Sequence, residues 1–563
     1  MNAAEWVVQP PRAEAGALAE ALSIPPALAR VLVNRRILTE EAARAFLRGG
    51  LDGLHDPYLM KGMDRAVARI EEAVARGEKI LVFGDYDVDG VLSTVMLMKA
   101  LTTLGAKVEY FIPERLTDGY GIKDEHVRVP VERGAGLVVS VDCGVKAVGF
   151  TAAARERGID VIVTDHHRPG EALPEAVAVL DPVLADSGYP DPGLAGVGVA
   201  FKLIQALLER AGRAAGLPHY MKLVAIGTVA DVAELRGENR LFVKHGLEGL
   251  QSVANPGLRS LIEACGLGKR RISEGDLGFR IGPRLNAAGR MGMADLAVSL
   301  FFSDSPEESG AVVRKLEELN ARRQKTEERI FEEARGRIEE RGLDRKYKCL
   351  VLASPDWHRG VIGIVASKIK ERFNRPVILF ACEDGKASGS GRSIPEVPLI
   401  ELLDECRDLF LSYGGHKLAV GCTLPVDRLP ELRRALNPLA EARIPEESLK
   451  KKIRIDGPLD LAAVDDRFLD TLAMFVPFGV GNPKPLFMAD GVEVAGEPQV
   501  LQGKHLKFLA RQDGRVLEAL GWDRADLRHV LRRGDKVSLA FSLLVSEYLG
   551  RRKVSLSIED LRT

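Results

Sequence analysis

The sequence predicts a multidomain α/β protein, and three observations lead to this fold class. At 563 residues the chain is too long for one hydrophobic core, which favours three or four domains. From about residue 60 to 235, strand-like apolar runs alternate with helical runs, as they do around a mostly parallel sheet. Residues 450–563 instead contain short alternating segments, which predict a β-rich final domain.

Composition limits the classes of function. The chain has 79 basic and 80 acidic residues, so any nucleic-acid binding must come from local patches. The six cysteines lie far apart with no Cys-x-x-Cys pair, which argues against a structural zinc site and a disulfide framework. We find neither a signal segment nor 18 uninterrupted apolar residues, and we therefore expect a cytoplasmic protein without a membrane span.

The first elements follow in order along the chain. Residues 1–50 are predicted to form short helices that carry no evident chemistry. Apolar runs then predict the strands of a parallel sheet at 79–84, 107–113, 137–142, 159–164 and 176–180. Helices are predicted near 61–76, 90–104, 145–157 and 198–213.

The strand at 79–84 ends in three carboxylates at alternate positions, Asp85, Asp87 and Asp89. Such side chains lie at the carboxyl edge of a parallel sheet, where ligands bind, and a divalent metal would offset their repulsion. The same residues could open an EF-hand loop, but that loop requires an acidic residue where Met96 stands and a helix where a strand is predicted. A solvated acidic turn is the other alternative.

Other apolar runs also end in polar groups. One of them is the run 223–230, which we group with the strands. These groups are Asp142, Asp165, His166, His167 and Asp231. Each has an ordinary alternative as a helix cap, a turn residue or a structural histidine. Taken together, these residues favour a site at one edge of the sheet that holds two divalent ions, about 3.5–4 Å apart, for phosphoester hydrolysis. Mixed carboxylate and imidazole ligands suit Mn²⁺ well and Mg²⁺ acceptably, and a histidine off the metals could assist proton transfer.

The ordered set of these motifs resembles the DHH phosphoesterase superfamily, and its longer forms resemble the RecJ branch of single-stranded-DNA exonucleases. The resemblance implies a catalytic site in which His167 acts without binding metal, together with Asp165 and Asp85. Asp85 is either a supporting group or a direct ligand of one metal. The implied metal ligands are Asp87, Asp89, Asp142, His166 and Asp231.

Residues 280–291 are predicted to form a glycine-rich basic turn. Guanidinium groups bind phosphate bidentately, so Arg280, Arg290 and the nearby Asn286 suit a phosphodiester backbone. A surface loop with solvated arginines is the alternative, and resemblance to a RecJ motif favours substrate binding. Residues 306–341 are highly charged with apolar residues at helical spacing, which predicts one long connector helix. A coiled-coil dimer remains an alternative.

A second α/β unit is predicted from about 347 to 440, with strands at 348–353 and 376–381. A small-residue strand edge then carries Ser390 and Arg392, and a Gly-Gly-His motif carries His416. The motif alone could be a helix-capping turn, but order and spacing resemble the DHHA1-like substrate-binding domain. In the RecJ branch this resemblance implies a pocket for the terminal 5′ phosphate, lined by Arg115, Arg280, Ser390 and Arg392.

Residues 501–563 hold thirteen basic and eight acidic residues, an excess of five positive charges. Strands are expected at 505–510, 516–522, 536–545 and 552–558, with stacking faces from His505, Phe508, Trp522 and Tyr548. This pattern suits an OB-like nucleic-acid-binding barrel, with a purely structural β-domain as the alternative. Val476 stands where the RecJ branch usually has glutamate, which leaves a local contact in question.

We therefore predict five regions, at 1–50 (N-terminal helices), 51–303 (phosphoesterase), 304–344 (connector helix), 345–445 (DHHA1-like) and 446–563 (OB-like). The resemblance implies a 5′-to-3′ exonuclease specific for single-stranded DNA, acting in DNA repair and recombination with two Mn²⁺ or Mg²⁺ ions. Single-strand-binding protein and a RecQ-like helicase are the partners it implies. Two alternatives are an oligonucleotide or dinucleotide phosphodiesterase and a catalytically inactive single-strand-binding scaffold.

Overall fold

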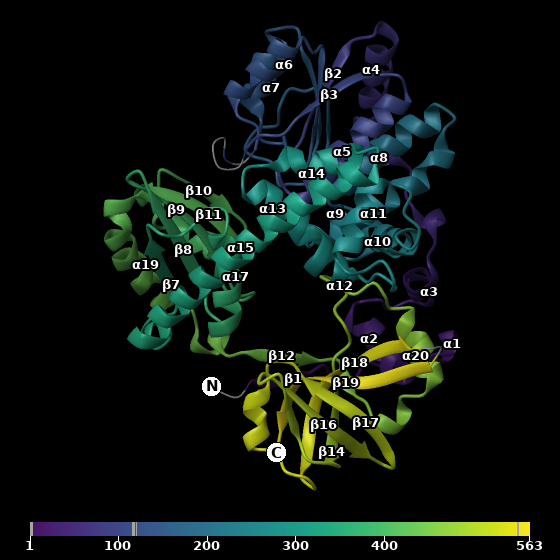
Figure 1. Ribbon diagram of the computed structural model, residues 1–563, viewed down its shortest axis with the longest axis vertical. Coiled ribbons are helices and arrows are strands. Elements are labelled where there is room, and N and C mark those ends of the chain that lie inside the picture. Colours follow the sequence, from purple (N-terminus) through teal and green to yellow (C-terminus); the bar gives the residue numbers. More distant parts are fainter. Residues whose placement is uncertain (1–3, 115–118, 120, 549–550) are drawn as a thin grey trace. The chain divides into compact units, whose positions relative to one another are not determined.

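A computed structural model describes residues 4–114, 119, 121–548 and 551–563. The chain forms two compact units. The central unit comprises residues 55–233 and 245–451, and the barrel unit comprises residues 1–54, 234–244 and 452–563. Each unit combines helices and sheets (Figure 1), so the predicted multidomain α/β class is confirmed. Arg115, one of the predicted phosphate-binding residues, lies outside the described residues.

The first sheet of the central unit has five parallel strands in the order β3-β2-β4-β5-β6. Its strands are β2 (Lys79–Phe83), β3 (Lys107–Phe111), β4 (Leu137–Val141), β5 (Asp160–Thr164) and β6 (Ala178–Leu180). Helices cover both faces (Figure 1), which is why the strands are nearly continuous apolar runs. These helices are α4 (Met63–Arg76), α5 (Val88–Thr103), α6 (Arg128–Arg133), α7 (Val148–Arg155) and α8 (Gly196–Arg210). All five predicted strands are confirmed.

A helical segment follows the sheet and corrects two predictions. The run 223–230 is a helix, because an apolar run of this length does not distinguish a buried helix from a buried strand. Residues 280–291 are mostly helical as well, since Pro283 suits the first turn of a helix and Arg284, Leu285, Ala287 and Ala288 favour helix despite the nearby glycines and asparagine. The helices are α9 (Met221–Ala230), α10 (Gly237–Gly249), α11 (Pro256–Ala264), α12 (Glu274–Asp276), α13 (Gly282–Arg290) and α14 (Ala294–Phe302).

The long helix predicted at 306–341 is confirmed as α15 (Pro306–Arg341). Ser305 caps its first turn by accepting a hydrogen bond from the Glu308 N–H, and Gly342 ends it in the left-handed conformation with φ 58°. Its buried apolar side chains recur at helical spacing, so one face packs within the central unit. A short helix, α16 (Leu343–Lys346), follows it.

The second sheet of the central unit has the order β10-β11-β9-β8-β7. The strand that carries Ser390 and Arg392 lies inside this sheet and not at its edge, which corrects the prediction. Its small residues explain this position, because a Cβ at Gly389 would lie 2.7 Å from the Cys422 sulfur on the neighbouring strand. The elements are β7 (Leu350–Ser354), β8 (Val377–Glu383), β9 (Lys386–Arg392), β10 (Ser412–Gly415), β11 (Ala419–Pro425), α17 (Ile362–Phe373), α18 (Leu399–Asp404) and α19 (Leu429–Arg443).

The barrel unit contains a seven-stranded sheet in the order β13-β14-β18-β19-β17-β16-β15, and an additional β14–β16 pairing closes it. Its strands are β13 (Gly457–Pro458), β14 (Phe487–Val494), β15 (Gln499–Leu501), β16 (His505–Gln512), β17 (Arg515–Gly521), β18 (Lys536–Tyr548) and β19 (Arg551–Arg562). Helices α1 (Glu14–Leu22), α2 (Pro26–Asn34), α3 (Glu40–Arg48) and α20 (Asp466–Ala473) belong to the same unit. Strand β1 (Glu5–Val8) pairs in parallel with β12 (Lys452–Ile455).

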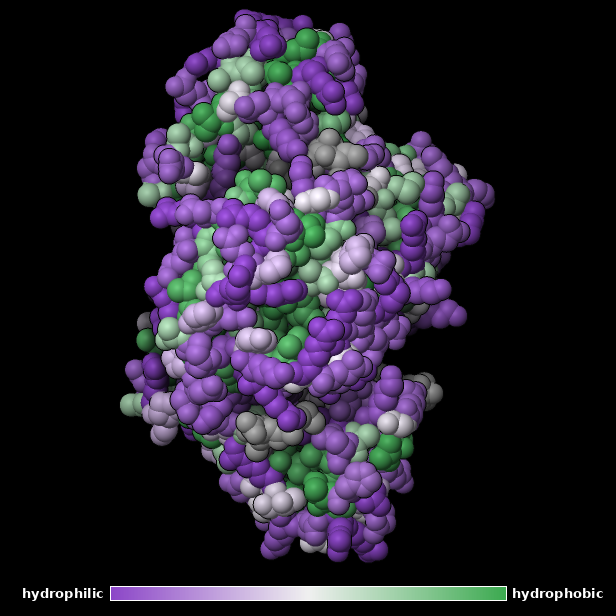
Figure 2. Space-filling view, turned by 90° about the vertical axis from the view of Figure 1, so that its left-hand side faces the viewer, coloured by the Kyte–Doolittle hydropathy of each residue, from purple (hydrophilic) through white to green (hydrophobic). Residues whose placement is uncertain are grey.

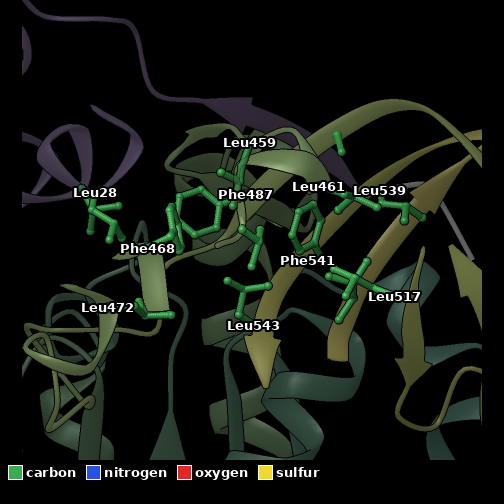
Figure 3. Packing of buried hydrophobic residues seen from close by; sticks show 14 of the residues in the cluster. Leu28, Leu459, Leu461, Phe468, Leu472, Phe487, Leu517, Leu539, Phe541 and Leu543 are labelled. Carbon is green, nitrogen blue, oxygen red and sulfur yellow. The ribbon is translucent and has the colours of Figure 1, made fainter. Parts of the chain in front are cut away.

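Phenylalanine and leucine side chains fill the core of the barrel unit (Figure 3). The Phe468 and Phe487 ring centroids lie 6.0 Å apart, and those of Phe487 and Phe541 lie 6.4 Å apart. Phe508 is only 2% exposed within this core, so it is not the stacking face that the sequence predicted.

The surface seen in Figure 2 is mostly hydrophilic, and its hydrophobic residues gather in small patches. Within the described ranges, no helix combines the length and the apolar character that a membrane span requires.

Candidate active site

The carboxylates after β2 are positioned by the start of α5. Asp87 caps this helix by accepting hydrogen bonds from the N–H groups of Asp89 (2.9 Å) and Gly90 (3.2 Å). Asp89 is buried and accepts hydrogen bonds from the N–H groups of Gly196 (2.8 Å) and Val197 (2.6 Å), in the first turn of α8. The α8 N-terminus therefore compensates part of the charge that Asp89 carries.

Asp142 follows β4 and has a left-handed backbone with φ 59°, a conformation that aspartate tolerates better than most residues. Its side chain is 2% exposed. The Cβ of any larger residue at Gly196 would lie 2.5 Å from Asp142 Oδ1, so glycine permits this close approach of α8. His166 Nε2 lies 3.1 Å from Asp142 Oδ1 and 3.9 Å from Asp89 Oδ2. Side chains after β2, β4 and β5 thus meet at one edge.

Asp165 faces the histidine loop. Its carboxylate accepts hydrogen bonds from the N–H groups of Val145 (2.8 Å), His166 (2.8 Å) and His167 (3.1 Å), and lies 2.7 Å from His167 Nδ1. Burial favours the neutral form of both side chains and is the largest single influence, but their mutual hydrogen bond and the neighbouring charges together outweigh it. The pKa of Asp165 is therefore lowered and the pKa of His167 is raised. Asp165 thus fixes the orientation of the His167 ring.

For the other titratable groups at this edge, burial and neighbouring like charges destabilise the charged form. Burial, followed by repulsion from Asp87, raises the pKa of Asp89 to about 7. Burial and neighbouring carboxylates also raise the pKa values of Asp142 and Asp231 well above their usual range. Burial, followed by the charge of His167, lowers the pKa of His166 to about 4. A cation placed among these groups would relieve the repulsion that disfavours their carboxylates.

The donor set fits a hard divalent cation. Asp142 Oδ1 and His166 Nε2 are buried and lie 3.1 Å apart, but neither has a partner with hydrogen-bond geometry among the described residues. Carboxylate oxygens with one imidazole suit Mn²⁺ or Mg²⁺. Three overlapping groups have ligand atoms within 4.8 Å of one another: Asp142, His166 and His167; Asp89, His166 and Asp231; Asp85, Asp87 and Asp142. All five predicted metal ligands occur in these groups, as do Asp85 and His167.

A second set of predicted residues gathers around residues 360–363, at the start of α17. Arg290 Nη1 donates a hydrogen bond to the Gly360 carbonyl (3.1 Å). Arg392 Nη1 donates to the Ser390 Oγ (3.3 Å), and a Cβ at Gly363 would lie 3.0 Å from that oxygen. The structure therefore brings Arg290, Ser390 and Arg392 to one region.

The remaining residues of the predicted basic motif have structural contacts. Asn286 Oδ1 accepts a hydrogen bond from the Val88 N–H (3.2 Å), which ties α13 to the start of α5. Arg280 Nη1 donates to the Cys265 carbonyl (3.1 Å), and its Nε lies 3.5 Å from Asp276. These contacts position α13, and Arg280 is held on the side of α12.

Near His416 the structure reveals basic residues that the sequence analysis missed. His416 lines a cavity of about 480 Å³ together with Lys146, Arg168 and Lys417. Two of them lie close behind the acidic motifs: Lys146 is two residues after Asp142-Cys143-Gly144, and Arg168 directly follows Asp165-His166-His167. That proximity was the available signal, but single basic residues form no motif of their own.

Comparisons with known proteins agree with this arrangement. Residues 79–228 match the family model "DHH family, N-terminal domain", residues 346–442 match "DHHA1 domain", and residues 455–560 match "RecJ OB domain". The chain is 38% identical to the single-stranded-DNA-specific exonuclease RecJ of Bacillus subtilis, over 99% of this chain and 70% of that protein.

Two crystal structures of Thermus thermophilus RecJ are also similar. The complex with Mn²⁺ has a TM-score of 0.85 at 35% identity, over 99% of this chain and 79% of that one. The complex with Mg²⁺ has a TM-score of 0.78 at 33% identity, over 99% and 78%. The near full-length identity, the three domain matches and the shared fold lead to one conclusion: the chain belongs to the RecJ family.

Proposed function

We propose that this protein is a single-stranded-DNA-specific exonuclease that hydrolyses phosphodiester bonds with two divalent cations, Mn²⁺ or Mg²⁺. The observation that carries this proposal is the meeting of four carboxylates and one imidazole at a single sheet edge, beside a histidine with a raised pKa. The relatives named as such exonucleases support the substrate class.

The proposed metal ligands are Asp87, Asp89, Asp142, His166 and Asp231. When bound, two such ions supply an activated water and stabilise charge on the phosphoryl oxygens. Asp165 holds the His167 ring, and the raised pKa of His167 keeps a proton available for the leaving oxygen or for a phosphoryl oxygen. Asp85 supports the cluster, as a ligand or next to one.

We also propose that digestion runs from the 5′ end. Arg290, Ser390 and Arg392, together with Arg115 and Arg280, would hold the terminal 5′ phosphate beside the metal ligands. Cleavage one nucleotide from that phosphate would release mononucleotides. His416 would contact the same strand, while Asn286 would keep α13 in place.

The barrel unit would also bind the strand, because its exposed Trp522, which packs against His505 with ring centroids 4.9 Å apart, offers a stacking face for a base. The domain matches lie within the predicted ranges 51–303, 345–445 and 446–563, and we propose these boundaries for the three domains. A cytoplasmic role in DNA repair and recombination, with single-strand-binding protein and a RecQ-like helicase as partners, follows from the family resemblance.

The test is a digest of an internally labelled, 5′-phosphorylated single strand with Mn²⁺. The same strand as a blunt duplex, with a blocked 5′ end, or with EDTA in place of the metal serves as control. We expect rapid loss of the free single strand alone. Equal digestion from both ends would refute the 5′ pocket, and tight binding without cleavage would refute the exonuclease.

A further inference from the structure

A cavity of about 660 Å³ lies within the central unit, and none of the proposed metal ligands lines it. Its volume falls in the range of small-molecule sites, about 300–1,000 Å³. Apolar side chains from several helices form much of its wall. Examples are Leu208 (α8), Leu223 (α9), Leu258 (α11) and Phe302 (α14). Such a wall suits a ligand with an aromatic or apolar part.

Three cations line the same cavity, and its described lining contains no carboxylate. They come from three segments: Lys99 lies on α5, Arg213 follows α8, and Lys222 lies in the first turn of α9. Among the described residues, none of the three has a carboxylate within ion-pair distance. The cavity therefore has an excess of positive charge, which favours an anionic ligand.

Hydrogen bonds to the backbone hold two of these cations in place. Arg213 Nη1 donates to the Thr103 carbonyl at the end of α5 (2.5 Å), and Lys222 Nζ donates to the Ser252 carbonyl (2.8 Å). An arginine has five N–H donors and a lysine has three, so each keeps further donors for a ligand.

Aromatic rings accompany the cations. Lys99 Nζ lies 4.9 Å from the centre of the Phe302 ring, and Phe302 and the half-buried Tyr220 both line the cavity. Burial lowers the pKa of Lys99, an effect that a bound anion would offset. Cations beside aromatic rings suit a ligand that combines an anionic group with an aromatic ring.

Three helices that line the cavity also hold the metal ligands at their other ends. Asp89 lies in the first turn of α5 and accepts hydrogen bonds from the first turn of α8, and Asp231 follows the last turn of α9. These helices pack against one another (Figure 1). Lys99 lies ten residues after Asp89, and Lys222 lies nine residues before Asp231, so the cavity is roughly 14–15 Å from the metal ligands along both helices.

We propose that this cavity is a regulatory site for a nucleoside 5′-monophosphate, coupled to metal binding at the sheet edge through α5, α8 and α9. A phosphomonoester carries a charge of about −1.5 to −2 at pH 7, which matches three cations better than a single carboxylate does. The phosphate accepts hydrogen bonds from Lys99, Arg213 and Lys222, and the base packs on Phe302 and Tyr220. This inference rests on the proposed function, because nucleoside monophosphates are the products of that hydrolysis.

The first test locates the ligand on the full chain in EDTA. The probe is 8-azido-2′-deoxyadenosine 5′-monophosphate, which is crosslinked by light, and labelled peptides are identified by mass spectrometry. We expect label on peptides that contain residues 213–223 or 301–302. Unlabelled dAMP should compete at least about tenfold better than deoxyadenosine or inorganic phosphate, because each of these lacks half of the contacts.

Two variants alter the cavity in different ways. Lys99→Met with Lys222→Met removes two charges but keeps the apolar stems, and should weaken labelling at least about tenfold. Thr102→Trp, at an exposed position of the lining, fills the space without removing a cation and should also prevent labelling. Lys315→Met, an exposed lysine on α15, is the matched control. An unchanged melting temperature shows that each variant is folded.

The second test measures the coupling. Mn²⁺ is titrated into wild type and into the Lys99→Met, Lys222→Met variant, with and without dAMP. We expect dAMP to change the Mn²⁺ affinity of wild type by at least about fivefold, and this change should be lost in the variant. Any dAMP that binds Mn²⁺ in solution or at the sheet edge affects both proteins equally, so the variant corrects for it.

The outcomes separate this proposal from the exonuclease itself. Label confined to the sheet edge, or labelling that neither variant weakens, would overturn the cavity site. An equal effect of dAMP on Mn²⁺ affinity in both proteins would overturn the coupling. A labelled cavity in a wild-type protein that does not cleave single-stranded DNA with Mn²⁺ would support the site and refute the exonuclease.

Discussion

Arg240 in the barrel unit and Asp89 at the sheet edge of the central unit are both buried charged groups, but they differ in how far their surroundings compensate the charge. In the barrel unit, the Arg240 guanidinium is 3% exposed and donates hydrogen bonds to backbone carbonyls, and its Cζ lies 3.9 Å from the centre of the Phe46 ring. The acceptors are Phe46, Met474, Phe475, Val476 and Pro477. At the sheet edge, Asp89 also has backbone donors, yet burial, followed by repulsion from Asp87, raises its pKa to about 7.

This difference separates structural charge from functional charge. The contacts around Arg240 organise the segment 474–477 through its carbonyls, so the Val476 side chain is not needed for them. At the sheet edge, Asp142 Oδ1 and His166 Nε2 are buried without a hydrogen-bond partner in the described residues and lie among carboxylates that repel one another, an arrangement that a bound cation would compensate. The barrel unit is stabilised by its own contacts, whereas the edge is stabilised fully only when a cation binds.

The largest expected effect tests the barrel side of this comparison. Phe541→Ala removes a fully buried ring that packs against Phe487, and should lower the free energy of unfolding of the barrel unit by about 3–5 kcal/mol. Chemical denaturation of the full chain measures this. Val545→Ala, at an exposed position on the same strand, is the control. Stabilisation by Mn²⁺ should persist in both variants, and its loss in Phe541→Ala would contradict the independence of the two regions.

The second-largest expected effect tests the sheet edge of the central unit. Asp142→Asn removes one of the repelling charges while asparagine still tolerates φ 59°, so the metal-free protein should melt at a higher temperature. Hydrolysis should fall at least about a hundredfold, because losing even a group that supports a metal ligand costs 10–100-fold. Mn²⁺ should raise the melting temperature of wild type and should no longer raise that of the variant.

Asp64→Asn, an exposed carboxylate at the start of α4, is the matched control for this substitution. A metal-free Asp142→Asn protein that is less stable than wild type would show that the carboxylate is compensated without a cation. Undiminished hydrolysis would remove Asp142 from the proposed metal ligands.

Local sequence patterns predicted much of the secondary structure and part of the candidate site. The five parallel strands and α15 follow from apolar runs and helical spacing, which depend on residues close in sequence. The meeting of Asp87, Asp89, Asp142 and His166 followed from the parallel order of those strands, since their carboxyl ends share an edge.

Other features depend on contacts between distant residues. The helix at 282–290 carries two glycines and an asparagine, which resemble a loop until packing stabilises the helix. Phe508 could be a surface or a core ring, and only barrel closure decides that it is buried. Lys146, Arg168 and Lys417 are ordinary basic residues in sequence, and only the tertiary fold brings them to one cavity.

A smaller effect concerns the exposed surface of the barrel unit. Trp522 is 54% exposed and packs beside His505, which makes it a stacking face for a base. Trp522→Ala should weaken binding of a long single strand by about 1–3 kcal/mol, measured by fluorescence anisotropy at fixed salt. Hydrolysis of a 5′-phosphorylated dinucleotide should be unchanged. Val516→Ala, an exposed position on β17, is the control, and equal weakening by both variants would argue against stacking.

The smallest expected effect completes the comparison, because it removes an exposed charge. Arg552 Nη1 lies 2.6 Å from Asp470 Oδ1 in the barrel unit, and the two side chains are 45% and 59% exposed. Water and salt screen such a pair, so Asp470→Asn should change the free energy of unfolding by at most about 1 kcal/mol. Denaturation at low and high salt measures the change. A larger, salt-independent loss would mean that exposed charge also supports the barrel unit, and that burial alone does not distinguish the two regions.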